Sequence, residues 1–154
     1  NEVDIPVTIF LPIGLIINDN NIDLHRSKCL HHYFFINKNC SLNKKEIFFN
    51  KIQNFSLNKL ISLEKILSSK NKYKDYVIAR NKISEKDLKT LNSMKNITIA
   101  SHSMTHVYLN LLPTNWLNWE IKKSIFYINK FNGYSNIFSL PYGNYNSFNK
   151  SVLS

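Results

Sequence analysis

The chain has 154 residues, 44% hydrophobic and 13% aromatic, a length and composition that suit one domain with a core and exclude a disordered chain. Its formal net charge of +10 favours anionic partners in general. The lysines are spread along the chain and Arg26 and Arg80 are the only arginines, so we do not expect sequence-specific binding of nucleic acid. No apolar run approaches the roughly 18 residues that a membrane span needs.

The first half of the chain predicts a strand followed by helices. Residues 5–11 have the pattern of a buried strand, which Pro12 and Gly14 then end. Three helices are expected next, and a further segment, 73–79, fits a helix or a strand equally well. The expected helices cover residues 23–37 (with Leu24, Leu30, Phe34 and Ile36 apolar), 44–53 (Ile47, Phe48, Ile52) and 57–68 (Leu60, Ile61, Leu63, Ile66, Leu67).

The second half predicts alternating helices and strands. Ser84 is placed to cap a helix that runs to about Met94, and a strand is expected over 97–101. Thr114 is expected to cap the next helix, 115–131, whose apolar stripe should face the core. Gly133 stops this helix, and a strand over 136–140 follows. A crossover helix of this length between two strands predicts parallel strands, and therefore an α/β sheet or barrel.

Two histidines, His102 and His106, follow the predicted strand 97–101. If the segment between them is helical, both imidazoles point the same way, which is a spacing used to offer two nitrogens to one metal ion. A tight turn, Pro141-Tyr142-Gly143, follows the next predicted strand. Working residues of α/β folds gather at the carboxyl ends of strands, so we expect the histidines and the turn to meet there.

These segments resemble motifs of the polysaccharide deacetylases, the NodB-homology family of carbohydrate esterases. Residues 102–106 resemble the motif H-[ST]-x-x-H, and residues 140–143 resemble the end of R-x-P-Y-G, with Ser139 at the arginine position. Residues 5–11 resemble a strand that comes shortly after the first motif of the family. The resemblance covers residues 1–17 and about 83–150, and it leaves residues 18–82 as a helical insertion.

The resemblance implies an α/β fold, part of a distorted (β/α) barrel, in one domain over residues 1–154. It implies a metal-dependent hydrolase that removes acetyl groups from N-acetylated polysaccharide or glycan. A divalent ion, Zn²⁺ above all, would be held by His102 and His106, with Ser103 supporting the loop between them. The backbone N–H of Tyr142 would stabilise the oxyanion, and the expected sugar contacts are Pro141, Tyr142, Gly143 and Tyr145.

The chain also departs from the family pattern. The first motif, T-F-D-D-G, supplies a carboxylate ligand and a base and should precede Ile5, where we assign neither role to Asp4. The later motifs would lie beyond Ser154, so we expect the middle of a catalytic domain. A catalytically inactive glycan- or protein-binding domain is the second hypothesis. The third is a basic module that binds anionic polymers, with a fortuitous histidine pair. The sequence does not distinguish a cell-envelope from a cytoplasmic location.

Other chemically notable residues favour structural roles. His25 and Cys29 are four residues apart on a predicted helix, and His31 is adjacent to His32, but a structural or surface role is favoured over metal binding. Cys29 and Cys40 form no C-x-x-C pair, and we expect two buried free thiols. Trp116 and Trp119 have rings that can stack on sugars, although one of them is expected in the core.

Overall fold

The computed structural model describes residues 4–16, 21–71, 83–132, 137–143 and 152. The expected segment 73–79, the helix stop Gly133 and the sugar contact Tyr145 lie outside the described residues. None of the helices in the described ranges is long and apolar enough to cross a membrane. The elements are β1 Val7–Leu11, α1 Ile13–Ile16, α2 Ile22–Ile36, α3 Leu42–Gln53, α4 Leu57–Lys70, α6 Glu85–Ser93, β2 Ile97–Ser101, a 3₁₀ turn Leu109–Leu111 and α7 Thr114–Asn132.

Strand β2 lies between β1 and the segment that follows α7. β1 and β2 are parallel, in a register that places Leu11 opposite Ser101. On its other side, Ser101 forms a parallel bridge with Phe138. The parallel arrangement expected from the crossover helix is therefore confirmed. Over its described part, the predicted strand 136–140 is reduced to this single bridge, in which Ser101 N–H donates to the Ile137 carbonyl and Ser139 N–H donates to the Ser101 carbonyl. Pairing does not continue beyond it, because the Ser139 carbonyl accepts a bond from the His102 imidazole.

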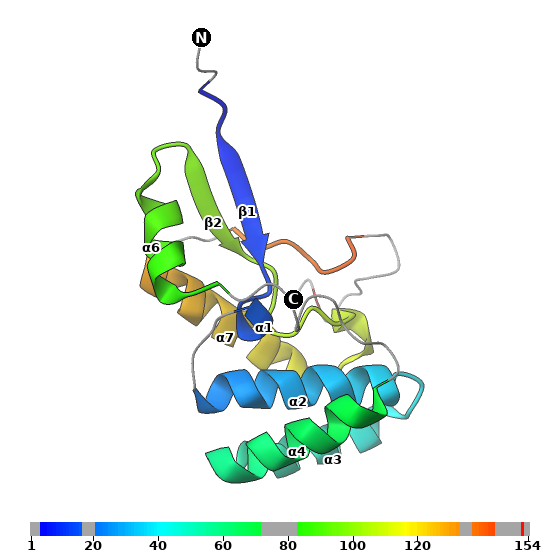
Figure 1. The fold of residues 1–154 in the computed structure, drawn as a ribbon. Coiled ribbons are helices and arrows are strands. Elements are labelled where there is room, and N and C mark those ends of the chain that lie inside the picture. Colours follow the sequence, from blue (N-terminus) through cyan, green and yellow to red (C-terminus); the bar gives the residue numbers. More distant parts are fainter. Residues whose placement is uncertain (1–3, 17–20, 72–82, 133–136, 144–151, 153–154) are drawn as a thin grey trace.

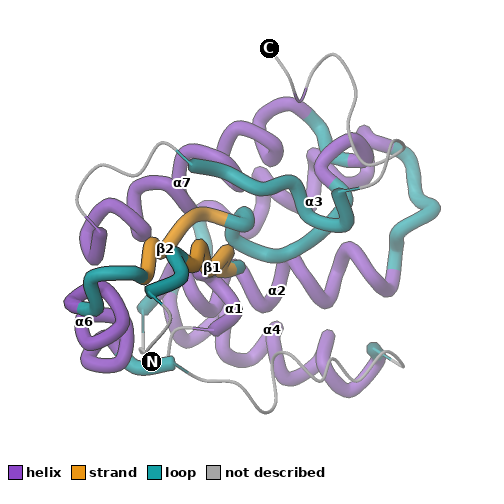
Figure 2. The backbone as a smooth tube through the Cα atoms, turned by 90° about the horizontal axis from the view of Figure 1, so that it is seen from above, coloured by secondary structure: helices purple, strands orange, loops and turns teal. Residues whose placement is uncertain are grey.

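The elements form layers, with the strands above α1 and α7, and α2, α3 and α4 below them (Figure 1). Helix α6 lies beside β2, and the view from above shows α7 and α2 on opposite sides of the strands (Figure 2). One apolar core lies under the strands against α1, α6 and α7, and a second joins α7 to the three lower helices. The described residues thus form a mostly helical α/β arrangement, and the expected barrel remains a prediction.

Strand β1 is less buried than its sequence predicts. Val7 is 46% exposed and Phe10 is 37% exposed, and only Leu11 at the end of the strand is buried. The expectation of a buried strand is wrong because, among the described residues, β1 pairs only with β2 and has helices packed against it chiefly at its lower end. The apolar composition of a strand does not reveal which of its faces are covered.

Side-chain caps set the helix starts, with one correction. Ser84 and Asp87 form a complete capping box at α6, in which each side chain bonds the backbone N–H of the other residue. Asn21 and Ser41 cap α2 and α3 in the same general way. Thr114 is the first residue of α7 rather than its cap, and the carbonyl of Pro113 accepts the bond from Leu117 N–H.

The apolar residues named for the three lower helices divide between buried and exposed positions, and the buried ones are Leu24, Leu30, Phe34, Ile52, Leu60 and Leu67. Ile36, Ile47 and Ile66 are exposed, whereas Phe49 and Leu67 are buried. Among the lower helices, α2 packs chiefly against α4.

The two cysteines are free thiols, as expected, but only Cys29 is buried and Cys40 is half-buried. The Cys29 thiol lies between α2 and α4, where its Sγ donates to the carbonyl of Leu60 at 3.4 Å. Burial raises the pKa of Cys29 to about 12, with a further contribution from the negative charge of Glu64.

We expect Cys29 to resist alkylation in the folded protein. A pKa of about 12 in place of 9.0 lowers the thiolate fraction at about pH 8 roughly a thousandfold. Iodoacetamide labelling followed by mass spectrometry of peptides should therefore modify Cys40 and leave Cys29 unlabelled until denaturant is added. Equal labelling of both cysteines in buffer would contradict the packing of α2 on α4.

Candidate active site

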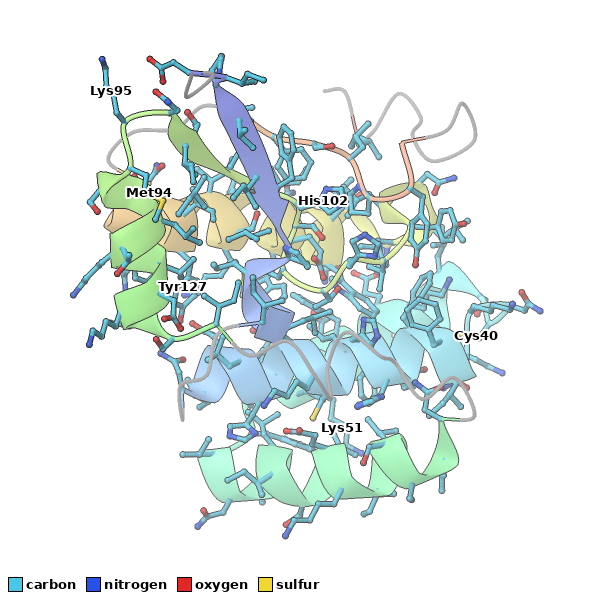
Figure 3. The ribbon with its side chains drawn as sticks, turned by 45° about the horizontal axis from the view of Figure 1, so that its top comes forward. Cys40, Lys51, Met94, Lys95, His102 and Tyr127 are labelled. Atoms are coloured by element: carbon cyan, nitrogen blue, oxygen red, sulfur yellow. The ribbon has the colours of Figure 1, made fainter. Side chains whose placement is uncertain are left out.

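His102 begins the candidate site, immediately after the end of β2. Its backbone N–H donates to the carbonyl of Leu11 at 3.1 Å, which ties it to the end of β1 as well. Its Nδ1 lies 2.9 Å from the carbonyl oxygen of Ser139. Since a carbonyl only accepts, Nδ1 carries the hydrogen and Nε2 of the neutral ring keeps its lone pair. In Figure 3, His102 lies near the lower ends of the strands, above the lower helices.

His106 is brought beside His102, although the segment between them is not helical. The two ring centroids are 4.8 Å apart with an angle of 59° between the planes, and both side chains are half-buried. The helical turn considered from the spacing is therefore wrong. Ser103 and His106 instead have left-handed φ angles of 66° and 52°, and these fold the loop back on itself.

The loop is internally supported by Ser103 but is also strained. The Ser103 hydroxyl accepts a hydrogen bond from the His106 backbone N–H at 3.0 Å. A left-handed φ costs a non-glycine residue roughly 1–2 kcal/mol. Strain of this kind persists only where surrounding contacts hold the backbone in place.

Glu120 of α7 supplies part of that support. Its side chain is fully buried and accepts bonds from the backbone N–H groups of Met104 and Thr105, both at 2.9 Å. It also accepts bonds from the Thr105 hydroxyl at 2.5 Å and the Trp116 indole at 3.0 Å. Burial raises the pKa of the Glu120 carboxyl, and the hydrogen bonds from Thr105, Trp116 and Met104 oppose that shift.

Two further contacts reach the loop from elements earlier in the chain. Nδ1 of the buried His31, on α2, lies 2.6 Å from the carbonyl oxygen of Thr105, so this nitrogen is also the protonated one. Gly14 of α1 lies so close to the loop that an added Cβ would be 2.8 Å from the Met104 carbonyl oxygen. The loop of residues 102–106, the histidine loop, is thus enclosed by α1, α2 and α7.

The Pro141-Tyr142-Gly143 turn lies against the histidines. Gly143 N–H donates to the Leu140 carbonyl at 3.2 Å, and Tyr142 has a left-handed φ of 67°. The Tyr142 ring is 39% exposed, with its centroid 4.9 Å from that of His106. Its ring also stacks on Tyr108 at 4.0 Å, with planes 7° apart. The structure therefore brings His102, His106 and this turn together.

Several other candidates lie elsewhere. Asp4 bonds Asn96, which precedes β2, so it lies at the opposite end of the strands from His102. His25 pairs with Glu64 at 2.6 Å, and the His32 ring bonds Asn71. Trp116 is fully buried, so it offers no face to a sugar, while Trp119 is half-buried. Within the described ranges, no three His, Cys, Asp or Glu side chains are grouped to hold a metal ion.

Sequence patterns alone missed Glu120, His31 and Tyr108 as neighbours of the site. For Glu120 a signal exists, because an acidic residue one turn after Trp116 and beside the apolar stripe of a helix must find buried donors. No comparable signal exists for His31, whose partner Thr105 is 74 residues away in the chain. Tyr108 lies two residues after His106, and no residue pattern in the sequence marks it as a neighbour of the site.

The fold and site define an α/β protein with two candidate imidazole ligands just after β2 and a tight turn after the segment that bridges β2 at Phe138. A comparison with protein families matches residues 63–153, more than half of the chain, to the family described as polysaccharide deacetylase. The chain belongs to the polysaccharide deacetylase family. This match includes both histidines, Glu120 and the Pro141-Tyr142-Gly143 turn. No curated protein and no solved structure matches the chain.

Proposed function

We propose that this chain carries the histidine ligands and part of the substrate-facing surface of a metal-dependent carbohydrate deacetylase. The observation that supports the proposal best is the pairing of His102 and His106, 4.8 Å apart, beside the turn that contains Tyr142. Membership of the polysaccharide deacetylase family makes an acetylated glycan the natural substrate class.

The two histidines suit Zn²⁺ or a similar divalent ion. Neutral imidazole is a preferred zinc ligand, and the bond from His102 Nδ1 to Ser139 leaves its Nε2 as the coordinating nitrogen. A bound ion would supply Lewis-acid activation of water and of the acetyl carbonyl. Zinc sites of this kind take a third protein ligand, which the family resemblance assigns to a motif ahead of Ile5.

The remaining site residues would orient the acetylated sugar. Ser103 keeps His106 in place through the bond to its backbone. The Pro141-Tyr142-Gly143 turn carries the Tyr142 N–H that we assign to the developing oxyanion, a role that backbone donors fill in acyl transfer. The exposed part of the Tyr142 ring and Tyr145 are the proposed sugar contacts, and Tyr108 supports Tyr142 by stacking.

A glycan-binding domain without catalysis is the second candidate. It is favoured by one observation, namely that within the described ranges no carboxylate joins the histidines in a group of metal ligands. Such a domain would keep the sugar-facing tyrosines but lack an evident general base to activate water.

Acetate release separates the two candidates. The protein as its native cell makes it would be incubated with an N-acetylated oligosaccharide and Zn²⁺, acetate would be assayed, and oligosaccharide binding would be measured by calorimetry. Chelator-sensitive acetate release is the expected result for the deacetylase. Binding that survives chelation without acetate would support the glycan-binding domain, and absence of both binding and release would contradict both candidates.

A further inference from the structure

The backbone from Ser103 to His106 is held by hydrogen bonds from outside the loop at each successive peptide plane. Glu120 binds the N–H of Met104 and the N–H of Thr105, which belong to two consecutive peptide units. His31 binds the carbonyl of Thr105, which belongs to the next unit. Because a peptide unit is rigid and planar, these bonds fix the orientation of every plane from Ser103 to His106.

The last of these planes is held at both of its ends. It contains the Thr105 carbonyl, bonded to His31 at 2.6 Å, and the His106 N–H, bonded to Ser103 Oγ at 3.0 Å. The direction of the His106 side chain follows from this plane and from its left-handed φ of 52°. His102 is tied independently, through its own N–H to Leu11 and through Nδ1 to Ser139. The two rings are therefore oriented by separate sets of bonds.

We infer that Glu120 and His31 are positioning residues, which together set the orientation of His106 relative to His102. Both are buried, and the bonds through which they hold the loop end on its backbone and on the Thr105 hydroxyl. His31 comes from α2, outside residues 63–153 that match the family, so it is a contribution of this chain's own helical layer to the site. The inference rests on the proposed function in one respect, namely that the orientation of the two imidazoles matters because they would bind a metal ion.

His31 is tested by two substitutions at the same position. His31→Leu removes the donor to Thr105, whereas His31→Asn returns an N–H donor at a position close to that of Nδ1. His32→Leu is the matched control, because His32 is the adjacent buried histidine on the same helix and bonds Asn71 instead. A role limited to packing would make the Leu variants at the two positions equivalent and would leave the Asn variant without rescue.

Glu120 is tested with Glu120→Gln, which keeps one oxygen to accept from the two loop N–H groups. Its amide N–H₂ then faces the Trp116 N–H, and two donors cannot form a hydrogen bond with each other. The loop should therefore loosen, although the Gln side chain fills nearly the same volume as Glu. Tyr127→Phe is the control on α7, because it removes a buried hydroxyl that bonds Asp23 of α2.

The first readout uses the metal-free protein, so that it does not depend on the proposed function. Nuclear Overhauser contacts between the His102 and His106 rings, and slow exchange of the Met104 and Thr105 amides, report the loop geometry. We expect both to be lost in His31→Leu and weakened in Glu120→Gln, and to be retained in His31→Asn and in both controls. Melting temperatures identify any variant that fails to fold.

Zinc affinity is the second readout. Loss of groups that orient metal ligands typically weakens binding by about 10–100-fold. We expect a decrease of this size in His31→Leu and recovery in His31→Asn. Ring contacts and amide protection that persist in both His31→Leu and Glu120→Gln would overturn the inference. Failure of the wild-type protein, as its native cell makes it, to bind zinc would instead overturn the proposed function, and the ring contacts would still decide the positioning roles.

Discussion

Replacement of either His102 or His106 by Ala is expected to weaken zinc binding by at least about 10–100-fold, since loss of a ligand exceeds the loss of a group that merely orients one. Each imidazole would supply one coordinating nitrogen, and the two ring centroids are 4.8 Å apart. Affinity would be measured by competition with a chromogenic chelator. His102→Ala should also lower the melting temperature, because its ring bonds the Ser139 carbonyl.

His25→Ala is the matched control for this prediction. His25 lies on α2 and pairs with Glu64, so its loss removes an ion pair without touching the proposed ligands. Zinc affinity should remain at the wild-type value in this variant. If all the histidine variants lose affinity equally, zinc binds nonspecifically to histidines and the assignment of His102 and His106 is wrong.

Gly14→Ala is expected to destabilise the protein by about 3 kcal/mol, the upper range for overpacking a tight contact. The added Cβ would lie 2.8 Å from both the Met104 carbonyl oxygen and the Ser27 Cβ. The Met104 oxygen belongs to the backbone of the histidine loop, so it cannot rotate away as a flexible side chain would. Urea unfolding should show the loss of stability, and zinc affinity should fall because the loop is displaced.

Gly143→Ala provides the comparison for Gly14→Ala. Among the described residues its added Cβ would meet only the Leu140 carbonyl oxygen, at an ordinary 3.8 Å, but the residue has a φ of +45°. The expected cost is therefore backbone strain alone, about 1 kcal/mol. Equal costs at the two glycines would contradict the close approach of α1 to the histidine loop.

Local sequence signals predicted the elements that position the site. The predicted strand 97–101 matches the bounds of β2, Ile97–Ser101. The strand begins with β-branched residues and ends where the polar histidine motif begins. The apolar stripe of α7 contains Leu117 and Ile128, which are buried as expected, whereas Ile121 and Ile125 are only half-buried. The Ser84 cap was also predictable, since a capping box depends on residues only three positions apart.

The site geometry depends on contacts between distant parts of the chain, and these were not predictable. The two histidines meet through left-handed residues rather than through a helix. The residue types of Ser103 and His106 do not by themselves predict a left-handed φ. The partners of the loop, Gly14, His31 and Glu120, come from three helices. Local preferences cannot specify a three-way contact of this kind, which exists only once the layers have packed.

The left-handed residues Ser103, His106 and Tyr142 place stability and activity in opposition. Glycine adopts this conformation without a steric penalty, so glycine at any of the three would relieve strain in the fold. It would also remove a loop support, an imidazole or an aromatic ring from the candidate site. Selection for thermal stability alone would therefore favour glycine at these three positions and remove the side chains of the candidate site. Selection for deacetylation would instead retain the strained residues.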